Sequence, residues 1–236
     1  MKRLQTKTAR LIAQTFESLD YQKLGTIYCD EGGEAFWEDR REPCRTLGIV
    51  LAEVLLNRLK SGGRSLYVGA GVAEIPMLFM EALDLERHID AFNLRVAEVA
   101  VLNQACKGLP LPISANDARS ARGSYDHLWI VSVLNDPEQY QNVSALCYGR
   151  ANPVTFNPHA FLEERTHIMA VAEACLKKVA LPGLVSTSVE EIPWITDWCD
   201  RNRIRYVVED EDYPTAIVED PVCLIRIEGD DPKEKR

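Results

Sequence analysis

The chain has 236 residues, of which 46% are hydrophobic and 27% are charged, and its net charge is −9. This composition is that of a globular protein with one α/β domain or two smaller ones, and the acidic balance argues against broad binding to a nucleic-acid backbone. No apolar run reaches the ~20 residues of a membrane span, and the amphipathic amino terminus lacks the features of a secretory signal. We therefore expect a cytoplasmic protein whose partner is a small molecule or a protein, with homo-oligomerisation left open.

The first 62 residues are predicted to form a helical cap or lid. Apolar residues recur at helical spacing from Thr6 to about Leu24, and residues 44–63 predict a second, strong helix that stops at Ser61-Gly62-Gly63. Residues 25–43 between them predict an acidic loop with Trp37. This tryptophan is either a packing anchor or part of a wall facing the substrate.

From residue 64 the pattern alternates between strand and helix. We predict strands over 64–69, 88–93, 111–116 and 125–134, with helices over 73–83 and 96–106. The run 125–134 is continuously apolar, which is typical of a parallel strand covered on both faces.

The last third of the chain begins with a loop-rich insertion over 135–157. Asn157-Pro158 then predicts the start of a helix that runs to about Val179. A strand over 183–188, a short helix with Trp194 and Trp198, and two closing strands follow. Those closing strands, 204–210 and 222–229, are too close together for a parallel crossover.

These elements predict one α/β domain over residues 1–236. Its core, 63–229, is expected to be a doubly wound, mainly parallel sheet, preceded by the N-terminal helices and followed by a tail, 230–236. In such sheets, ligands bind beyond the carboxyl ends of the strands.

Neither cysteines nor histidines indicate a metal site. The seven cysteines form no CxxC motif, and the four histidines lack ligand spacing. Reduced, buried thiols are therefore expected.

The stretch Gly69-Ala70-Gly71 joins the first strand of the alternating region to a helix. Glycine lets the backbone turn sharply there and lets a ligand approach without meeting a Cβ atom. The alternative interpretation is a tight turn with no ligand.

Polar residues follow the next three predicted strands. Asn93 could hold ribose hydroxyls or cap the following helix, and Asp117 could accept a hydrogen bond from an adenine amino group or form a surface turn. Asn135, Asp136 and Tyr140 follow the fourth strand and are candidates for substrate contact, although Asn-Asp-Pro also forms an ordinary turn.

In this order of motifs, residues 45–227 resemble the class I S-adenosylmethionine-dependent methyltransferases. The resemblance implies a seven-stranded sheet with an antiparallel last strand. It also implies S-adenosylmethionine as the cofactor and methyl transfer to an unidentified small-molecule or protein substrate. It implies that the cofactor is held by Gly69, Ala70, Gly71, Asn93, Leu94, Asp117, Ala118 and Val133. The residues that it places toward the substrate are Trp37, Asn135, Asp136 and Tyr140, and it identifies no catalytic residue.

The chain departs from the family pattern in several places. Tyr67 stands where the family commonly has an acid, Ala73 replaces a glycine, and Asn93 replaces the acid after the second strand. The Asn/Asp-Pro-Pro-aromatic motif of amino-group methylators is absent after the fourth strand. These departures are what a catalytically inactive binding or scaffolding protein predicts, which is the first alternative.

An NAD-binding oxidoreductase is the second alternative. Such an enzyme shares the glycine turn, but here Glu74 follows that turn in the first turn of the helix. Its carboxylate would repel a diphosphate at a helix end otherwise suited to anions, whereas a sulfonium cofactor carries no phosphate.

Overall fold

The computed structural model describes residues 2–29, 33–110, 112–217 and 220–229. The chain divides into two compact units: unit 1 comprises Met1–Ala121 and Tyr213–Glu219, and unit 2 comprises Arg122–Asp212 and Asp220–Arg236. The tail expected over 230–236 lies outside the described residues, and the single domain with a cap over 1–62 stays a prediction. Within the described ranges, no helix has the length and apolar character needed to cross a bilayer.

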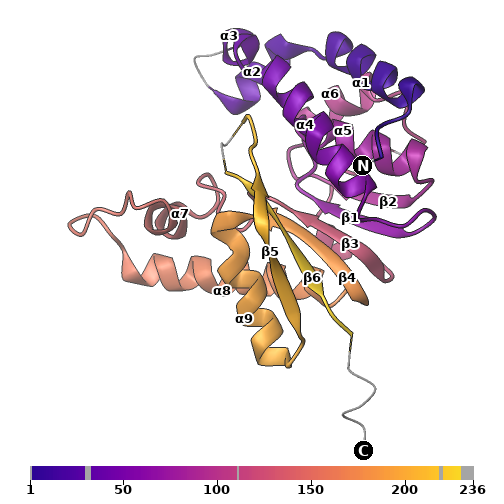
Figure 1. Cartoon of the computed structure of the whole chain (residues 1–236). Coiled ribbons are helices and arrows are strands. Elements are labelled where there is room, and N and C mark those ends of the chain that lie inside the picture. The colour runs from indigo at the N-terminus through magenta and orange to yellow at the C-terminus, as the bar shows by residue number, and fades with distance from the viewer. Residues whose placement is uncertain (1, 30–32, 111, 218–219, 230–236) are drawn as a thin grey trace, which may run out of the picture. The chain divides into compact units, whose positions relative to one another are not determined.

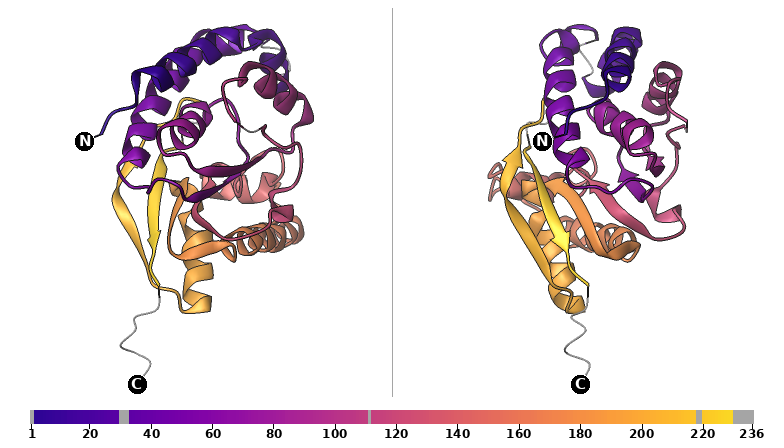
Figure 2. Two further views of the ribbon diagram at one scale, coloured as in Figure 1. Left: turned by 90° about the vertical axis from the view of Figure 1, so that its right-hand side faces the viewer. Right: turned by 45° about the vertical axis from the view of Figure 1, so that its right-hand side comes forward.

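The N-terminal helices of unit 1 are confirmed, with different boundaries from those predicted. They are α1 (Thr6–Ser18), α2 (Tyr21–Tyr28), α3 (Ala35–Glu38) and α4 (Arg41–Leu56). The first predicted helix is two helices, because Leu19 adopts an extended conformation and Asp20 caps α2 by accepting a hydrogen bond from the Lys23 amide. Helices α1 and α4 pack against each other and run side by side in both views of Figure 2.

Two parallel strands of unit 1 precede the predicted ligand turns. Strand β1 (Arg64–Val68) pairs with β2 (His88–Phe92), and the pairing runs from Arg64 and His88 to Val68 and Phe92. The remaining helical elements are α5 (Ile75–Phe79), the π-helix η1 (Met80–Asp84), α6 (Val96–Ala105) and the 3₁₀ helix η2 (Ala118–Ser120).

The prediction of seven strands is not confirmed: the described residues form six. In the described part of the segment expected to be the third strand, residues 112–116, Ser114 makes a single bridge, pairing parallel with Phe92. Pro110 and Pro112 have no amide hydrogen to donate to a neighbouring strand. The Ile113 amide and carbonyl are instead bonded by the side chain of Asn103, at 2.7 and 2.8 Å, so the ladder does not extend.

The described residues of unit 2 form four strands in the order β3-β4-β6-β5. Strand β3 pairs parallel with β4, whereas β4 pairs antiparallel with β6, which confirms the expected reversal of the last strand. Figure 1 shows β5 and β6 as neighbouring arrows and α9 beside α8. The elements are β3 (Tyr125–Ile130), α7 (Gln141–Cys147), α8 (Pro158–Leu176), β4 (Val179–Ser188), η3 (Val189–Glu191), α9 (Ile192–Asn202), β5 (Tyr206–Tyr213) and β6 (Val222–Ile227).

The predicted start of α8 is confirmed. Asn157 is the N-cap, and its side-chain oxygen accepts hydrogen bonds from the His159 and Ala160 amides at 3.1 and 3.2 Å. Pro158 occupies the first turn, where its missing amide hydrogen leaves no helical bond unmade.

A buried ion pair lies beneath β1 in unit 1. The Arg87 guanidinium donates to Glu81 at 2.9 Å, and neither side chain is exposed to solvent. Ser65 and Tyr67, on one face of β1, donate their hydroxyl hydrogens to the same carboxylate. Tyr67, at the position where the family commonly has an acid, is thereby held on a carboxylate of η1.

The cysteines provide a first prediction. All seven are free, and all but Cys29 and Cys147 are buried. Burial raises the pKa of Cys44 and Cys106 to about 12 and that of Cys199 to about 11, so at pH 8 the thiolate fraction of each is roughly one thousandth or less. We expect a disulfide reagent such as 5,5′-dithiobis(2-nitrobenzoate) to modify at most Cys29 and Cys147 rapidly in the native protein, and all seven in guanidinium chloride. Rapid modification of all seven in the native state would contradict this burial.

Candidate cofactor and substrate sites

The glycine turn of unit 1 joins the carboxyl ends of β1 and β2. The Gly69 and Ala70 amides both donate to the Phe92 carbonyl at 2.9 Å, immediately before Asn93. Gly69 has a φ of +77°, a left-handed conformation that a residue with a Cβ atom rarely adopts. The structure therefore brings together the predicted cofactor residues 69–71 and Asn93.

Gly71 is surrounded by side-chain oxygens. Its amide donates to Glu74 Oε2 at 2.7 Å. A Cβ atom at Gly71 would lie 2.9 Å from Glu98 Oε1 and 3.2 Å from Tyr28 Oη. Both carboxylate residues are buried, with 7% exposure for Glu74 and 1% for Glu98. Two carboxylates thus converge on Gly71, the glycine of the turn at which a Cβ atom would collide with a neighbouring side chain.

Asn93 is hydrogen-bonded through both ends of its amide. Its Nδ2 donates to the Ala70 carbonyl at 2.9 Å and to Glu98 Oε2 at 3.1 Å, while its Oδ1 accepts from the Arg95 amide at 2.8 Å. The side chain therefore links the glycine turn to the start of α6. The next residue, Leu94, leaves more than half of its surface exposed to solvent.

Tyr28, on α2, reaches this cluster from the N-terminal helices. Its hydroxyl donates to Glu98 Oε1, and burial together with the neighbouring Glu98 raises its pKa well above the ordinary value, so the hydroxyl stays protonated. The ring stacks on Phe36 at 5.6 Å and meets Trp37 edge-on at 5.4 Å. Trp37 is 1% exposed and packs among these rings as an anchor, while a contact with substrate stays a prediction.

The sequence does not predict Tyr28 and Glu98 as residues of the cofactor site. Glu98 lies in the first turn of α6 and Tyr28 in the last turn of α2, so neither directly follows a strand. The available signal in the sequence is Glu98 itself, the charged residue of α6, five positions after Asn93.

Asp117 forms a local turn at the start of η2. Its carboxylate accepts from the Arg119 amide at 2.8 Å and pairs with the Arg119 guanidinium at 2.6 Å. Ala118, the next residue, is buried, and η2 packs against β1. Asp117 thus has the capping role expected of a surface turn, and its contact with adenine stays a prediction.

In unit 2, a buried carboxylate anchors the loop after β3. Glu191, at the end of η3, accepts from the Ser132 amide at 3.0 Å, from the Val133 amide at 2.6 Å and from the Leu134 amide. Ser132 has a φ of +54°, which is uncommon for a residue other than glycine. Three successive amides held by one carboxylate give this loop a defined course.

The other predicted substrate residues lie beyond that loop. Asn135 is 1% exposed, and its Oδ1 accepts from Trp194 Nε1 at 2.9 Å. Asp136 accepts from the Glu138 amide at 2.9 Å, as in an ordinary turn. Tyr140 is buried, and its ring lies edge-on against His167 with the ring centres 5.7 Å apart. Asn135 and Tyr140 therefore face different neighbours.

Comparisons with known proteins identify the fold. No protein-family model matches the chain, and no curated protein is similar to it in sequence. The magnesium protoporphyrin IX methyltransferase of Synechocystis PCC 6803, solved with bound S-adenosylmethionine, has a TM-score of 0.52 and 13% identity over 97% of this chain and 100% of that chain. The N-methyltransferase NodS of Bradyrhizobium japonicum WM9, solved with S-adenosyl-L-homocysteine, has a TM-score of 0.46 and 15% identity over 92% of this chain and 100% of that chain.

The chain therefore has the fold of the class I S-adenosylmethionine-dependent methyltransferases, as the sequence resemblance implied. The residues of unit 1 fit such a cofactor in charge, because Glu74 and Glu98 are aimed at Gly71 and suit a cation. The Tyr28 and Glu98 oxygens also lie on the side from which Gly71 would be approached. A ligand that reaches Gly71 therefore has to displace the hydrogen bond between Tyr28 and Glu98.

Proposed function

We propose that the chain binds S-adenosylmethionine through the glycine turn of unit 1 and methylates a small-molecule or protein substrate. The cofactor supplies a methyl group already activated on a positively charged sulfur, so the protein has mainly to bind, orient and exclude water. No side chain is assigned as a catalytic base.

The convergence of Glu74 and Glu98 on Gly71 carries this proposal. The sequence lacks an acid at Tyr67 and at Asn93, which removes two carboxylates that usually surround this cofactor. Glu74 and Glu98 supply two carboxylates at the same turn from other positions. Their negative charge favours the sulfonium and ammonium groups of S-adenosylmethionine.

The other residues of the site have roles that their present bonds support. Asn93 can exchange one of its amide bonds for a ribose hydroxyl, because an amide both donates and accepts. Asp117 remains half-exposed beside Arg119 and can accept from an amino group. Tyr28 supplies a protonated hydroxyl that can donate to the ligand once it leaves Glu98.

A catalytically inactive binding module is the second candidate. The observation that favours it is the internal satisfaction of the turn: the Gly71 amide and both ends of the Asn93 amide are bonded within the protein. The same Glu74 carboxylate argues against the third candidate, because it takes an amide that could otherwise bind a diphosphate of NAD.

Thermal unfolding with and without ligand tests these candidates. A ligand that binds only the native state raises the unfolding midpoint, and at 100 times its Kd it adds about 2.7 kcal/mol to the free energy of unfolding. We expect 1 mM S-adenosylmethionine or S-adenosylhomocysteine to raise the midpoint and 1 mM NAD to leave it unchanged. No shift with either sulfur compound would exclude the methyltransferase, and a shift with NAD alone would favour the oxidoreductase.

Asp117→Ala tests the assignment of the adenine contact in the same experiment. We expect the variant to lose much of the shift, whereas Asp197→Ala keeps it. Asp197 is a matched control because it is a similarly exposed carboxylate paired with an arginine, Arg201, on α9 of unit 2. An unchanged shift in Asp117→Ala would mean that adenine is bound elsewhere.

A further inference from the structure

The orientation of the Asn135 side chain is fixed by its neighbour Trp194. An indole N–H can only donate, so the amide atom that Trp194 Nε1 contacts at 2.9 Å is the oxygen. Cys147 Sγ lies 3.9 Å from the same oxygen. The amide nitrogen Nδ2 therefore points away from both, and its two hydrogens remain to be bound by another group.

That nitrogen is buried without a partner. Neither Asn135 Nδ2 nor the Ser144 hydroxyl has a hydrogen-bond partner within the described part of the chain, and both residues are 1% exposed. Ser144 lies three positions before Cys147 on α7, so the two share a helix face on the side of Asn135. An unsatisfied buried polar group costs about 1–3 kcal/mol, and native proteins retain such groups mainly where a ligand or an ordered water satisfies them.

The surrounding charges restrict what this ligand can be. Burial raises the pKa of the neighbouring Cys147 thiol, and the negative charges of Glu190 and Glu191 add to that rise. Asp220, 6% exposed, accepts from the Tyr148 hydroxyl and, at 3.4 Å, from Ser132 Oγ. The carboxylates disfavour an anionic ligand, while an ammonium group has no lone pair to offer Nδ2.

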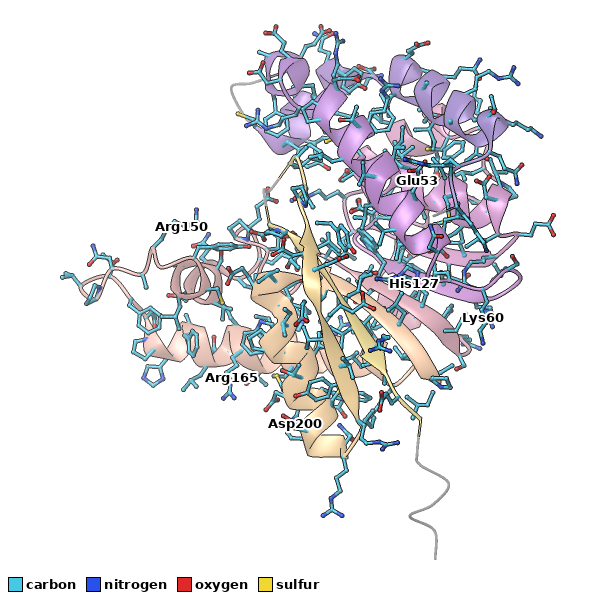
Figure 3. All side chains as sticks on the ribbon, viewed as in Figure 1. Glu53, Lys60, His127, Arg150, Arg165 and Asp200 are labelled. Carbon is cyan, nitrogen blue, oxygen red and sulfur yellow. The ribbon has the colours of Figure 1, made fainter. Side chains whose placement is uncertain are left out.

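One cation lies at the edge of this region. The Arg150 guanidinium stands over the Tyr148 ring, with 4.9 Å from its carbon to the ring centre. Figure 3 labels it on the loop after α7. Burial raises the pKa of Asp220, and the charge of Arg150 opposes part of that rise. Arg150 is thus engaged with the Tyr148–Asp220 pair, and the region around Asn135 keeps its surplus of carboxylates.

We propose that Asn135 Nδ2 and the Ser144 hydroxyl bind a neutral oxygen acceptor of the substrate, such as the carbonyl of an amide or a ketone. This deepens the proposed function by naming the group that unit 2 recognises, and it depends on that function only in calling the ligand a substrate. It also gives Asn135 the role of a donor, whereas recognition of an amine would require its oxygen as an acceptor.

Nuclear magnetic resonance of ¹⁵N-labelled protein tests this without the cofactor. The Asn135 side-chain NH₂ and the Trp194 indole N–H are followed during titration with three probes of similar size: N-methylacetamide, acetate and methylammonium. We expect N-methylacetamide alone to shift the Asn135 signals to saturation. Equal responses to acetate or methylammonium, or contacts of the NH₂ group with water only and no response to any probe, would overturn the proposal.

Two variants complete the test. Asn135→Asp keeps an oxygen for Trp194 and removes the donor, so the N-methylacetamide response of the Trp194 indole signal is expected to disappear. Ser144→Ala is expected to weaken probe binding roughly 2- to 10-fold, the range for one neutral hydrogen bond. A dispersed backbone amide spectrum like that of the unchanged protein shows that each variant is folded, and unchanged probe affinity in both would overturn the proposal. Because the samples contain no S-adenosylmethionine, a protein that fails to bind this cofactor still gives a readable result.

Discussion

Replacing Arg87 with methionine is expected to lower the free energy of unfolding by about 3–5 kcal/mol, the usual cost of removing one partner of a buried ion pair. The substitution leaves the Glu81 carboxylate fully buried without the cation that neutralises it, although the hydroxyls of Ser65 and Tyr67 still donate to it. It also removes the hydrogen bond of 2.6 Å that the guanidinium donates to the carbonyl of Lys60, a residue labelled in Figure 3. Urea unfolding, followed by circular dichroism, measures the change.

Arg64→Met is the matched control for this prediction. Arg64 pairs with Asp90 at 3.1 Å, but both side chains are partly exposed, and such pairs contribute about 0–1 kcal/mol. The double variant Glu81→Gln/Arg87→Met, which removes the buried charge as well, is expected to recover part of the loss. Equal destabilisation by Arg64→Met and Arg87→Met would mean that the buried pair has no special role.

Replacing Glu98 with glutamine is expected to weaken S-adenosylmethionine binding roughly 10- to 150-fold, which corresponds to the 1.5–3 kcal/mol of a hydrogen bond to a charged group. The substitution keeps the shape of the side chain and a partner for the Tyr28 hydroxyl. It removes one of the two negative charges that converge on Gly71. Isothermal titration calorimetry measures the affinity directly.

Glu53→Gln is the control for the loss of a buried charge. Glu53, labelled on α4 in Figure 3, is 6% exposed and pairs with Arg3 in unit 1, without a contact to the glycine turn among its described bonds. We expect its affinity for the cofactor to equal that of the unchanged protein. If Glu98→Gln also binds with unchanged affinity, the carboxylate is structural and the charge argument for the cofactor fails.

Much of the fold follows from the periodicity of apolar residues and from the turn and capping residues that begin and end the helices and strands. The alternation of strands and helices and the cap at Asn157 depend on local patterns that one stretch of chain contains, whereas the reversal of the last strand is implied by the family resemblance. The absence of the expected third strand from the described sheet could not be predicted from such local patterns. Its residues have strand-like composition, but Asn103, ten positions away, takes the backbone groups of Ile113.

The candidate site was predictable only where it lies in strand-end loops. Gly69, Gly71 and Asn93 were found because parallel strands end at one edge of a sheet, and the structure brings them together. Glu98 and Tyr28 lie inside helices, and their approach to Gly71 depends on the packing of α2 against α6. The unpaired amide of Asn135 depends on Trp194, 59 positions away, and no local pattern reports such a contact.

The anchoring of the loop after β3 has a consequence for how this protein can diverge. Glu191 holds residues 132–134 through their backbone amides, which every amino acid except proline possesses. The side chain of Val133, which is only partly buried, takes no part in that anchoring. Substitutions at Val133 can therefore change the side chain that the loop presents to a ligand without changing the backbone conformation of the loop. Because Glu191 holds the backbone alone, the specificity of the loop can change while its shape is kept.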